Sequence, residues 1–157
     1  MAPAGTAPEI DPDDARVIRF RTFSKAHGMA GARVGYGIGA AALVAGFDRV
    51  RNHFGMSRIS QDGALAAIAD RDWLDEVREK VSKSRDRIAA IARANALVPL
   101  PSATNFVTID CGHDGGFARA LVKALARRGV FVPLPFAAPQ DRCIRISCGR
   151  DEDLDVL

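Results

Sequence analysis

The residues best equipped for chemistry lie in one stretch, residues 21–39. Thr22 and Ser24 carry hydroxyl groups, and Arg33 carries a planar guanidinium that is always charged. Neutral donors combined with such a cationic fork are what a phosphate monoester requires. Gly28 allows the backbone to turn tightly and to approach a ligand closely. The stretch therefore predicts a phosphate-binding loop.

Lys25 lies among these groups. An amine in this position is either another phosphate ligand or a nucleophile that forms an imine with a carbonyl. A ligand with both a phosphate and an aldehyde would use both features, and pyridoxal phosphate is such a molecule. The alternative is a surface loop with a solvated lysine. The apolar strands expected on both sides of the loop argue against it.

Hydrophobic periodicity predicts the elements that position this loop. Short alternating or apolar runs indicate strands, and three-and-four spacing indicates helices. We expect the first strand to be buried over residues 17–23. Strands are predicted at 15–23, 34–38, 105–110, 130–134 and 143–148, and helices at 40–54, 61–69, 72–95, 117–128 and from 151 onward.

A second candidate for chemistry lies in the strand predicted at 143–148. Alternation places Ile144 and Ile146 on one face, and Arg145 and Ser147 on the other. An arginine fixed in a strand can offer a bidentate fork to a carboxylate from a rigid platform. For the strand taken alone, an exposed edge-strand arginine remains the favoured interpretation.

A third pattern, Gly35, Gly37 and Ala40, matches the G-x-G-x-x-A sequence of dinucleotide-binding loops. That pattern requires a strand before it, a helix opening within it and an acidic residue about 20 positions later. Asp62 is near this distance, but it lies in helical sequence. The favoured interpretation is that the glycines let the second strand pack closely against its neighbours.

Composition limits the class of protein. The formal net charge of +3 over 157 residues is too diffuse to indicate a nucleic-acid partner. No apolar run reaches the ~18 residues of a membrane span. The N-terminus carries acids and prolines where a signal peptide would carry a basic patch and an apolar block. We therefore expect a cytoplasmic protein that binds neither nucleic acid nor membrane.

The cysteines and histidines agree with this expectation. Three cysteines are few and odd in number, which is typical of a reducing compartment. Cys143 and Cys148 are an odd number of positions apart on a predicted strand, so they should face opposite sides and should not pair. The three histidines have no ligand spacing, and no metal site is expected.

A family resemblance rests first on residues 24–36, which read SKAHGMAGARVGY. This run resembles the lysine signature of class I/II aminotransferases, which are fold-type I pyridoxal-phosphate enzymes, and most of all the histidinol-phosphate aminotransferase-like branch. The resemblance implies that Lys25 forms the internal aldimine with the cofactor. It also implies that Arg33, Ser24 and Thr22 bind the cofactor phosphate.

Two further motifs carry the resemblance. Residues 143–149, CIRISCG, look like the late motif of the family, whose arginine binds the substrate α-carboxylate; this implies a substrate-binding role for Arg145. Residues 101–106, PSATNF, resemble the Pro-Ser-x-x-Asn-Phe strand entry of the family. Asn105 either lines the site or has a structural role. This sequence departs from the family pattern at His27, where many relatives have phenylalanine, and at residues 52–56. These departures leave the identity of the substrate open.

The resemblance implies an α/β fold, the C-terminal part of the fold-type I transferase. It covers nearly everything from Val17 onward, and family members are much longer chains, so we expect a truncated chain. The expected divisions are a flexible lead-in (1–16), the remainder of the large cofactor domain with the lysine loop (17–60), bridging helices (61–95) and a small α+β domain (96–157).

The resemblance also implies the reaction. We expect amino transfer from an amino acid to a 2-oxo acid, with pyridoxal 5′-phosphate as cofactor, in a complete enzyme that is a homodimer. Two alternatives remain open. One is a pyridoxal-phosphate-dependent decarboxylase of the same fold, because the lysine motif does not select which bond at Cα is cleaved. The other is an inactive structural remnant.

Overall fold

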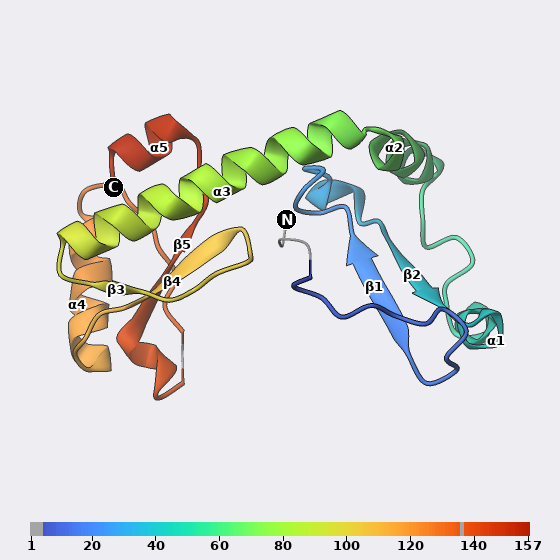
Figure 1. Ribbon diagram of the computed structural model, residues 1–157, viewed down its shortest axis with the longest axis horizontal. Helices are drawn as coiled ribbons and strands as arrows, with labels where there is room; N and C mark the ends of the chain where they lie inside the picture. The colour runs from blue at the N-terminus through green and yellow to red at the C-terminus, as the bar shows by residue number, and fades with distance from the viewer. Residues whose placement is uncertain (1–4, 136) are drawn as a thin grey trace. The chain divides into compact units, whose positions relative to one another are not determined.

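The computed structural model describes residues 5–135 and 137–157, so residues 1–4 of the predicted lead-in lie outside the described residues (Figure 1). The chain divides into two compact units, residues 5–77 and the described part of residues 78–157. The boundary falls within the longest helix, α3 (Arg71–Ala94). This helix agrees with the prediction at 72–95 and, at 1.5 Å per residue, is about 36 Å long.

The first unit contains a two-stranded antiparallel sheet of β1 (Ile18–Thr22) and β2 (Gly35–Gly39). In its register Thr22 lies opposite Gly35. A Cβ atom on Gly35 would lie 2.5 Å from the carbonyl oxygen of Arg21. Only glycine therefore fits here, and the prediction that β2 packs closely through its glycines is confirmed. Gly37 also lies within β2 and not in a strand-to-helix turn, so the dinucleotide-binding alternative is wrong.

The predicted burial of the first strand is wrong. Phe20, in the middle of β1, keeps 63% of its surface exposed. Its ring makes an edge-to-face contact with Phe47, with centroids 5.8 Å apart. Since the sheet has two strands in the described part of the chain, this side chain has one aromatic neighbour and no enclosing layer.

The helix predicted at 40–54 is also wrong in its length. The structure has a short helix, α1 (Ala41–Ala45), followed by a 3₁₀ turn, η2 (Gly46–Arg49). Gly46 is the C-cap of α1, and glycine is a poor residue for a helix interior. The next helix, α2 (Arg58–Ala69), confirms the helix predicted at 61–69 and begins three residues earlier, because the side chain of Ser57 caps it.

The second unit contains a three-stranded antiparallel sheet in the order β3-β4-β5 (Figure 1). Helix α3 precedes the sheet in sequence, and a 3₁₀ turn, η3 (Gln140–Arg142), leads into β5. The helices α4 and α5 complete the described part of the unit. The remaining bounds are β3 (Val98–Pro99), β4 (Phe106–Asp110), α4 (Gly115–Ala126), β5 (Cys143–Ser147) and α5 (Asp151–Asp155).

The core of this unit lies on one face of the sheet. Val107 and Ile109 of β4 lie opposite Ile146 and Ile144 of β5 in register. Side chains of α3, α4 and α5 pack onto these four residues and complete the buried cluster. Removing this much apolar surface from water is the main stabilising contribution to such a unit. The other face of the sheet carries the polar side chains of both strands.

The strand predicted at 130–134 is not formed. The segment lies beside β5, and one backbone bond joins them, from Arg145 N to the oxygen of Pro133 (3.1 Å). Pro133 and Pro135 have no N–H group, so the segment cannot continue a hydrogen-bonded ladder. Val132 and Leu134 still pack against the core.

The three cysteines are unpaired in the structure, and Cys148 lies just beyond the end of β5. Cys111, Cys143 and Cys148 are free thiols. Burial is the largest cause that raises the pKa of each thiol above its usual value. Among the helices that the structure describes, none has the length and apolar character to cross a membrane.

Candidate cofactor site

The lysine loop, residues 23–34, connects β1 to β2 in the first unit. Its two ends are buried residues, Phe23 and Val34, and the N–H of Phe23 donates to the oxygen of Val34 (3.3 Å). Inside the loop, Met29 N donates to the oxygen of Phe23 (3.1 Å). Gly28 has φ +65°, which glycine adopts without strain. The loop therefore has a defined internal structure, in which Lys25 lies in the turn at residues 24–27.

The two predicted hydroxyl ligands lie together at the start of this loop. The hydroxyl of Thr22 donates to the hydroxyl oxygen of Ser24 (2.8 Å), and Ser24 N donates to Thr22 Oγ1 (3.1 Å). Thr22 is exposed and Ser24 is half-buried. The structure thus brings together two of the groups that the sequence assigns to phosphate binding.

Arg33 lies at the other end of the loop in a left-handed backbone conformation, with φ 51° and ψ 45°. This conformation costs a residue other than glycine roughly 1–2 kcal/mol, so the surrounding structure must enforce it. The guanidinium is exposed, and its Nη1 donates to the oxygen of Ala30 (2.7 Å). One donor of five is used within the loop, and the others are available to an anion.

The side chain of Lys25 is exposed, and the carbonyl of Lys25 accepts from Gly28 N (3.0 Å). The side chain is therefore open to solvent, on the same short segment as the hydroxyl pair and Arg33. Two neutral donors, a guanidinium and an amine on one short loop match the chemistry of a ligand with a phosphate and an aldehyde. The residues present fit pyridoxal phosphate.

Aromatic side chains support the base of the loop. The ring of Phe23 contacts His27 (centroids 5.1 Å apart) and Tyr36 (5.6 Å). Nδ1 of His27 is buried and has no hydrogen-bond partner among the described residues. His27 thus packs as an aromatic ring against Phe23.

Two residues that the sequence did not predict hold the loop from outside. Ser60 of α2 donates to the oxygen of Ala32 (2.7 Å), and Nε1 of Trp73 in α3 donates to the oxygen of Ala26 (3.2 Å). These bonds span 28 and 47 residues of sequence, respectively. A local pattern cannot reveal contacts of such separation.

Arg145 belongs to the second unit. It lies on the polar face of β5, opposite Thr108 in register, and its guanidinium carbon is 5.0 Å from the centroid of the Phe106 ring. The expected alternation is confirmed, since Ile144 and Ile146 are buried while Arg145 is exposed. A guanidinium over an aromatic face is held in place and keeps its N–H groups for an anion.

Asn105 has a structural contact through its backbone: its carbonyl oxygen accepts from Cys148 N (2.9 Å). This bond continues the pairing of the two strands beyond Phe106 and Ser147. Because this bond involves only the backbone, both alternatives for the Asn105 side chain stay predictions.

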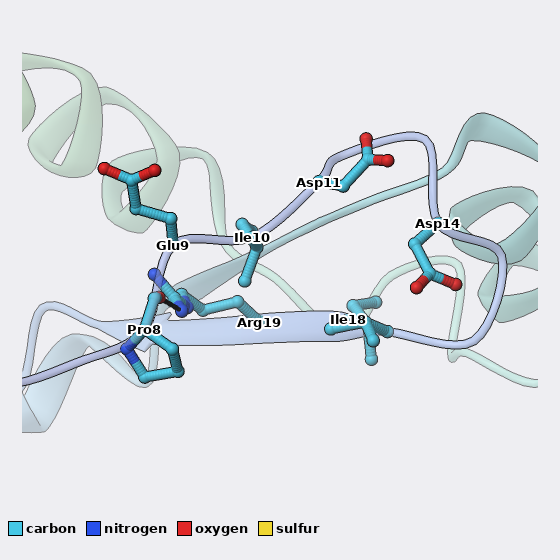
Figure 2. Close-up of a pocket in the computed structure, with 8 residues that line it drawn as sticks. Pro8, Glu9, Ile10, Asp11, Asp14, Ile18 and Arg19 are labelled. Carbon is cyan, nitrogen blue, oxygen red and sulfur yellow. Dashed lines mark hydrogen bonds between the residues drawn. The ribbon is translucent and has the colours of Figure 1, made fainter.

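An acidic hollow lies elsewhere in the first unit (Figure 2). Its volume is about 460 Å³, and residues 8–14 form one side while β1 forms the other. Asp14 is already paired with Arg16, and Arg19 donates to the oxygen of Pro8. The hollow contains none of the predicted site residues. Among the described residues no group of three or more His, Cys, Asp or Glu is arranged to hold a metal ion.

Comparisons with known proteins place these observations in a family. The family model described as aminotransferase class I and II matches residues 2–157. A histidinol-phosphate aminotransferase of Gluconacetobacter diazotrophicus is 40% identical over 141 residues, which are 87% of this chain and 39% of that protein. One from Bordetella parapertussis is 35% identical over 154 residues, 96% of this chain and 42% of that protein.

Solved structures agree with the sequence comparison. The crystal structure of a histidinol-phosphate aminotransferase from Sinorhizobium meliloti, in complex with pyridoxal-5′-phosphate, is 52% identical with a TM-score of 0.88. The match covers 92% of this chain and 39% of that one. A likeness to N-succinyldiaminopimelate aminotransferase of Mycobacterium tuberculosis, at 24% identity and a TM-score of 0.73, supports the fold alone.

This chain spans about two fifths of the length of the relatives it matches. The expected α/β fold, a C-terminal portion of the fold-type I transferase, is confirmed. The lysine loop, the arginine strand and these similarities point to the same group of proteins, and the chain belongs to the aminotransferase class I and II family.

Proposed function

We propose that this chain supplies the cofactor-anchoring part of a pyridoxal-phosphate-dependent aminotransferase of the histidinol-phosphate type. Lys25 binds the cofactor covalently, and Thr22, Ser24 and Arg33 hold its phosphate. The observation that carries the proposal is the hydroxyl pair, 2.8 Å apart, at the point where β1 runs into the loop of Lys25 and Arg33. The cofactor named for the Sinorhizobium meliloti relative supports it.

The chain's own residues divide the work of amino transfer. Bound pyridoxal phosphate supplies the electron sink that stabilises negative charge at the substrate Cα. The amine of the substrate would displace that of Lys25 from the cofactor, and the freed amine of Lys25 would then move the Cα proton as a general acid and base. The phosphate ligands fix the orientation of the ring relative to Lys25, which lowers the entropic part of the barrier.

Arg145 binds the acidic group of the substrate. The substrates are an amino donor and a 2-oxo acid acceptor. A 2-oxo acid carries a carboxylate, whereas histidinol phosphate carries a phosphate and no carboxylate. A guanidinium fork pairs with either anion, so one arginine serves both half-reactions.

The complete protein works as a homodimer in the cytoplasm. Large apolar side chains of the first unit are exposed, among them Phe54 at 95%, which supports association with further protein surface. The three free thiols support a reducing compartment.

A titration with pyridoxal phosphate, followed by absorbance, tests the proposal. We expect saturable binding by the chain, and binding weakened about tenfold or more by Lys25→Ala. Lys123→Ala, which removes an exposed lysine of α4, is the matched control and should bind as the unmodified chain does. Equal weak binding by all three proteins would contradict the proposal.

Product analysis then identifies the reaction. The cofactor-loaded chain is mixed with amino acids or histidinol phosphate, and a single turnover is measured. Formation of the corresponding carbonyl product supports amino transfer. Release of carbon dioxide from an amino acid would identify a decarboxylase instead, and tight binding without turnover would identify an inactive remnant.

A further inference from the structure

Ser60 is the one polar residue of the first unit that is buried in the described structure, with 8% of its surface exposed. Its hydroxyl proton goes to the oxygen of Ala32 (2.7 Å), and the hydroxyl of Ser57 lies 2.8 Å from Ser60 Oγ. Because a serine has one hydroxyl proton, Ser57 is the donor in that pair. The N–H of Ser60 in turn donates to Ser57 Oγ (3.1 Å). The two serines are therefore bonded to each other in both directions, and the hydroxyl of Ser60 also bonds to the lysine loop.

The carbonyl that Ser60 binds immediately precedes Arg33. The peptide joining Ala32 to Arg33 is thereby fixed at its oxygen, while Ala32 N donates to the oxygen of Met29 (3.1 Å). Beyond Arg33, the oxygen of Val34 accepts from Phe23 N (3.3 Å). The left-handed conformation of Arg33 is held between these fixed peptides. Strained backbone of this kind persists only where neighbouring contacts enforce it.

Trp73 fixes the other half of the loop. Its indole N–H donates to the oxygen of Ala26, the residue after Lys25 (3.2 Å). The position of Trp73 is itself fixed, since its backbone N–H donates to Asp70 Oδ1 (3.0 Å) at the junction of α2 and α3. The loop is thus held at Ala26 from α3 and at Ala32 from α2.

We propose that Ser60 and Trp73 are positioning residues for the cofactor site: Ser60 sets the direction of the Arg33 guanidinium toward the phosphate, and Trp73 sets the position of Lys25. This inference rests on the proposed function for its ligand. It assigns different roles to Ser60 and Trp73. Ser60 bonds next to Arg33, a phosphate ligand, whereas Trp73 bonds next to Lys25, the residue that binds the aldehyde.

Hydrogen exchange of the chain without cofactor tests the anchoring itself. Four amides donate to carbonyl oxygens within the loop, those of Phe23, Gly28, Met29 and Ala32. We expect Ser60→Ala to speed exchange at Ala32, and Trp73→Phe at Gly28, each by about three- to tenfold, the effect of losing one hydrogen bond. Ser82→Ala, which removes a hydroxyl from α3, is the control and should leave these rates unchanged. Rates equal to those of this control would overturn the inference.

A comparison of two aldehydes separates positioning from a merely structural role. Dissociation constants are measured for pyridoxal phosphate and for pyridoxal, which lacks the phosphate. We expect Ser60→Ala to lower the preference for the phosphorylated form about three- to tenfold. We expect Trp73→Phe to weaken both ligands and to keep the preference. Equal weakening of both ligands by Ser60→Ala would overturn the role assigned to Ser60.

The two proposals fail in different ways. If the unmodified chain binds neither aldehyde, the proposed function is contradicted, and the exchange rates alone decide whether Ser60 and Trp73 hold the loop. If the chain binds pyridoxal phosphate and the variants behave as the Ser82→Ala control in both measurements, the proposed function stands and the positioning roles are wrong.

Discussion

At the scale of single residues, the chemistry of the lysine loop can be predicted from its residue types. Its backbone conformation cannot be predicted in this way. Thr22, Ser24 and Arg33 could be selected from the sequence because hydroxyls and a guanidinium at this spacing suit a phosphate. The left-handed conformation of Arg33 could not, since the peptide before it is bonded by Ser60, 27 positions further along the chain than Arg33. The sequence therefore predicts candidate ligands, but it does not reveal the distant contacts that Ser60 and Trp73 make with the loop.

The strain at Arg33 can be measured by comparing two variants. Arg33→Ala and Arg33→Gly both remove the guanidinium, but only glycine adopts φ 51° without steric cost. We expect Arg33→Gly to have a free energy of unfolding about 1 kcal/mol higher than Arg33→Ala, and both to lose affinity for pyridoxal phosphate. Denaturant titration measures the difference. Equal stability of the two variants would show that the backbone carries no strain here.

At the scale of elements, the sequence predicted correctly the helix with strong hydrophobic periodicity. The predictions were wrong where the formation or burial of one element depends on contacts with another. The apolar stripe of α3 located that helix to within a residue at each end. The segment at 130–134 has strand composition, but Pro133 has no N–H group to donate and Pro135 follows the segment directly, so no ladder with β5 forms. Phe20 is apolar and exposed, because burial requires a covering layer that the composition of one strand cannot reveal.

The end of α3 gives a prediction about stability. The helix ends with two bonds, from Ala96 N to the oxygen of Arg93 (3.1 Å) and from Leu97 N to that of Ala92 (2.9 Å). This is a Schellman motif, with Ala96 at φ 58° in the position that usually holds glycine. We expect Ala96→Gly to raise the free energy of unfolding by about 1 kcal/mol.

Ala94→Gly is the matched control for that substitution. Ala94 is the last helical residue of α3, where glycine costs about 1 kcal/mol relative to alanine. The two substitutions should therefore change stability in opposite directions in thermal or denaturant unfolding. A loss of stability in both variants would contradict the account of the helix end.

The start of β5 gives a prediction about pH. The carboxylate of Asp110 accepts from Arg142 Nε (2.9 Å) and from Gly112 N (2.8 Å). The bond from Arg142, followed by that from Gly112, lowers the pKa of Asp110 below its usual value. A lowered pKa in the folded state means that this stabilisation is present above the unfolded pKa, about 3.9, and is lost as pH falls through the folded value.

Asp110→Asn should remove this part of the pH dependence. We expect the stability of the variant to fall less steeply than that of the unmodified chain between about pH 5 and pH 2. At neutral pH the variant should be the less stable protein, because its amide is a weaker acceptor for Arg142. Denaturant titrations at a series of pH values provide the test, and parallel curves for the two proteins would rule out a contribution from Asp110.

At the scale of the whole molecule, the two units differ in how far they bury their own apolar residues. Residues 78–157 enclose a core that includes Ile88, Ile109 and Ile144, each at most 1% exposed. In the described part of residues 5–77, the buried residues are Phe23, Val34 and Ser60. All three support the lysine loop. The buried residues of the first unit thus lie in or against the lysine loop, while many of its large apolar side chains are exposed.

The family and its fold could be recognised from the sequence, because the lysine run and the arginine strand are both local patterns. The domain boundaries expected at residues 60 and 95, and the roles of Lys25, Thr22, Ser24, Arg33 and Arg145, stay predictions. Among these, the role of Lys25 is the central claim, because every other assignment in the site refers to the ligand that it binds.

Reductive trapping tests this claim most directly. The chain is mixed with pyridoxal phosphate and reduced with borohydride, and the labelled peptide is located by mass spectrometry. The account predicts one adduct, on Lys25, which is lost in Lys25→Ala and kept in Lys123→Ala. Labelling that is spread over several exposed lysines and unchanged in Lys25→Ala would contradict it.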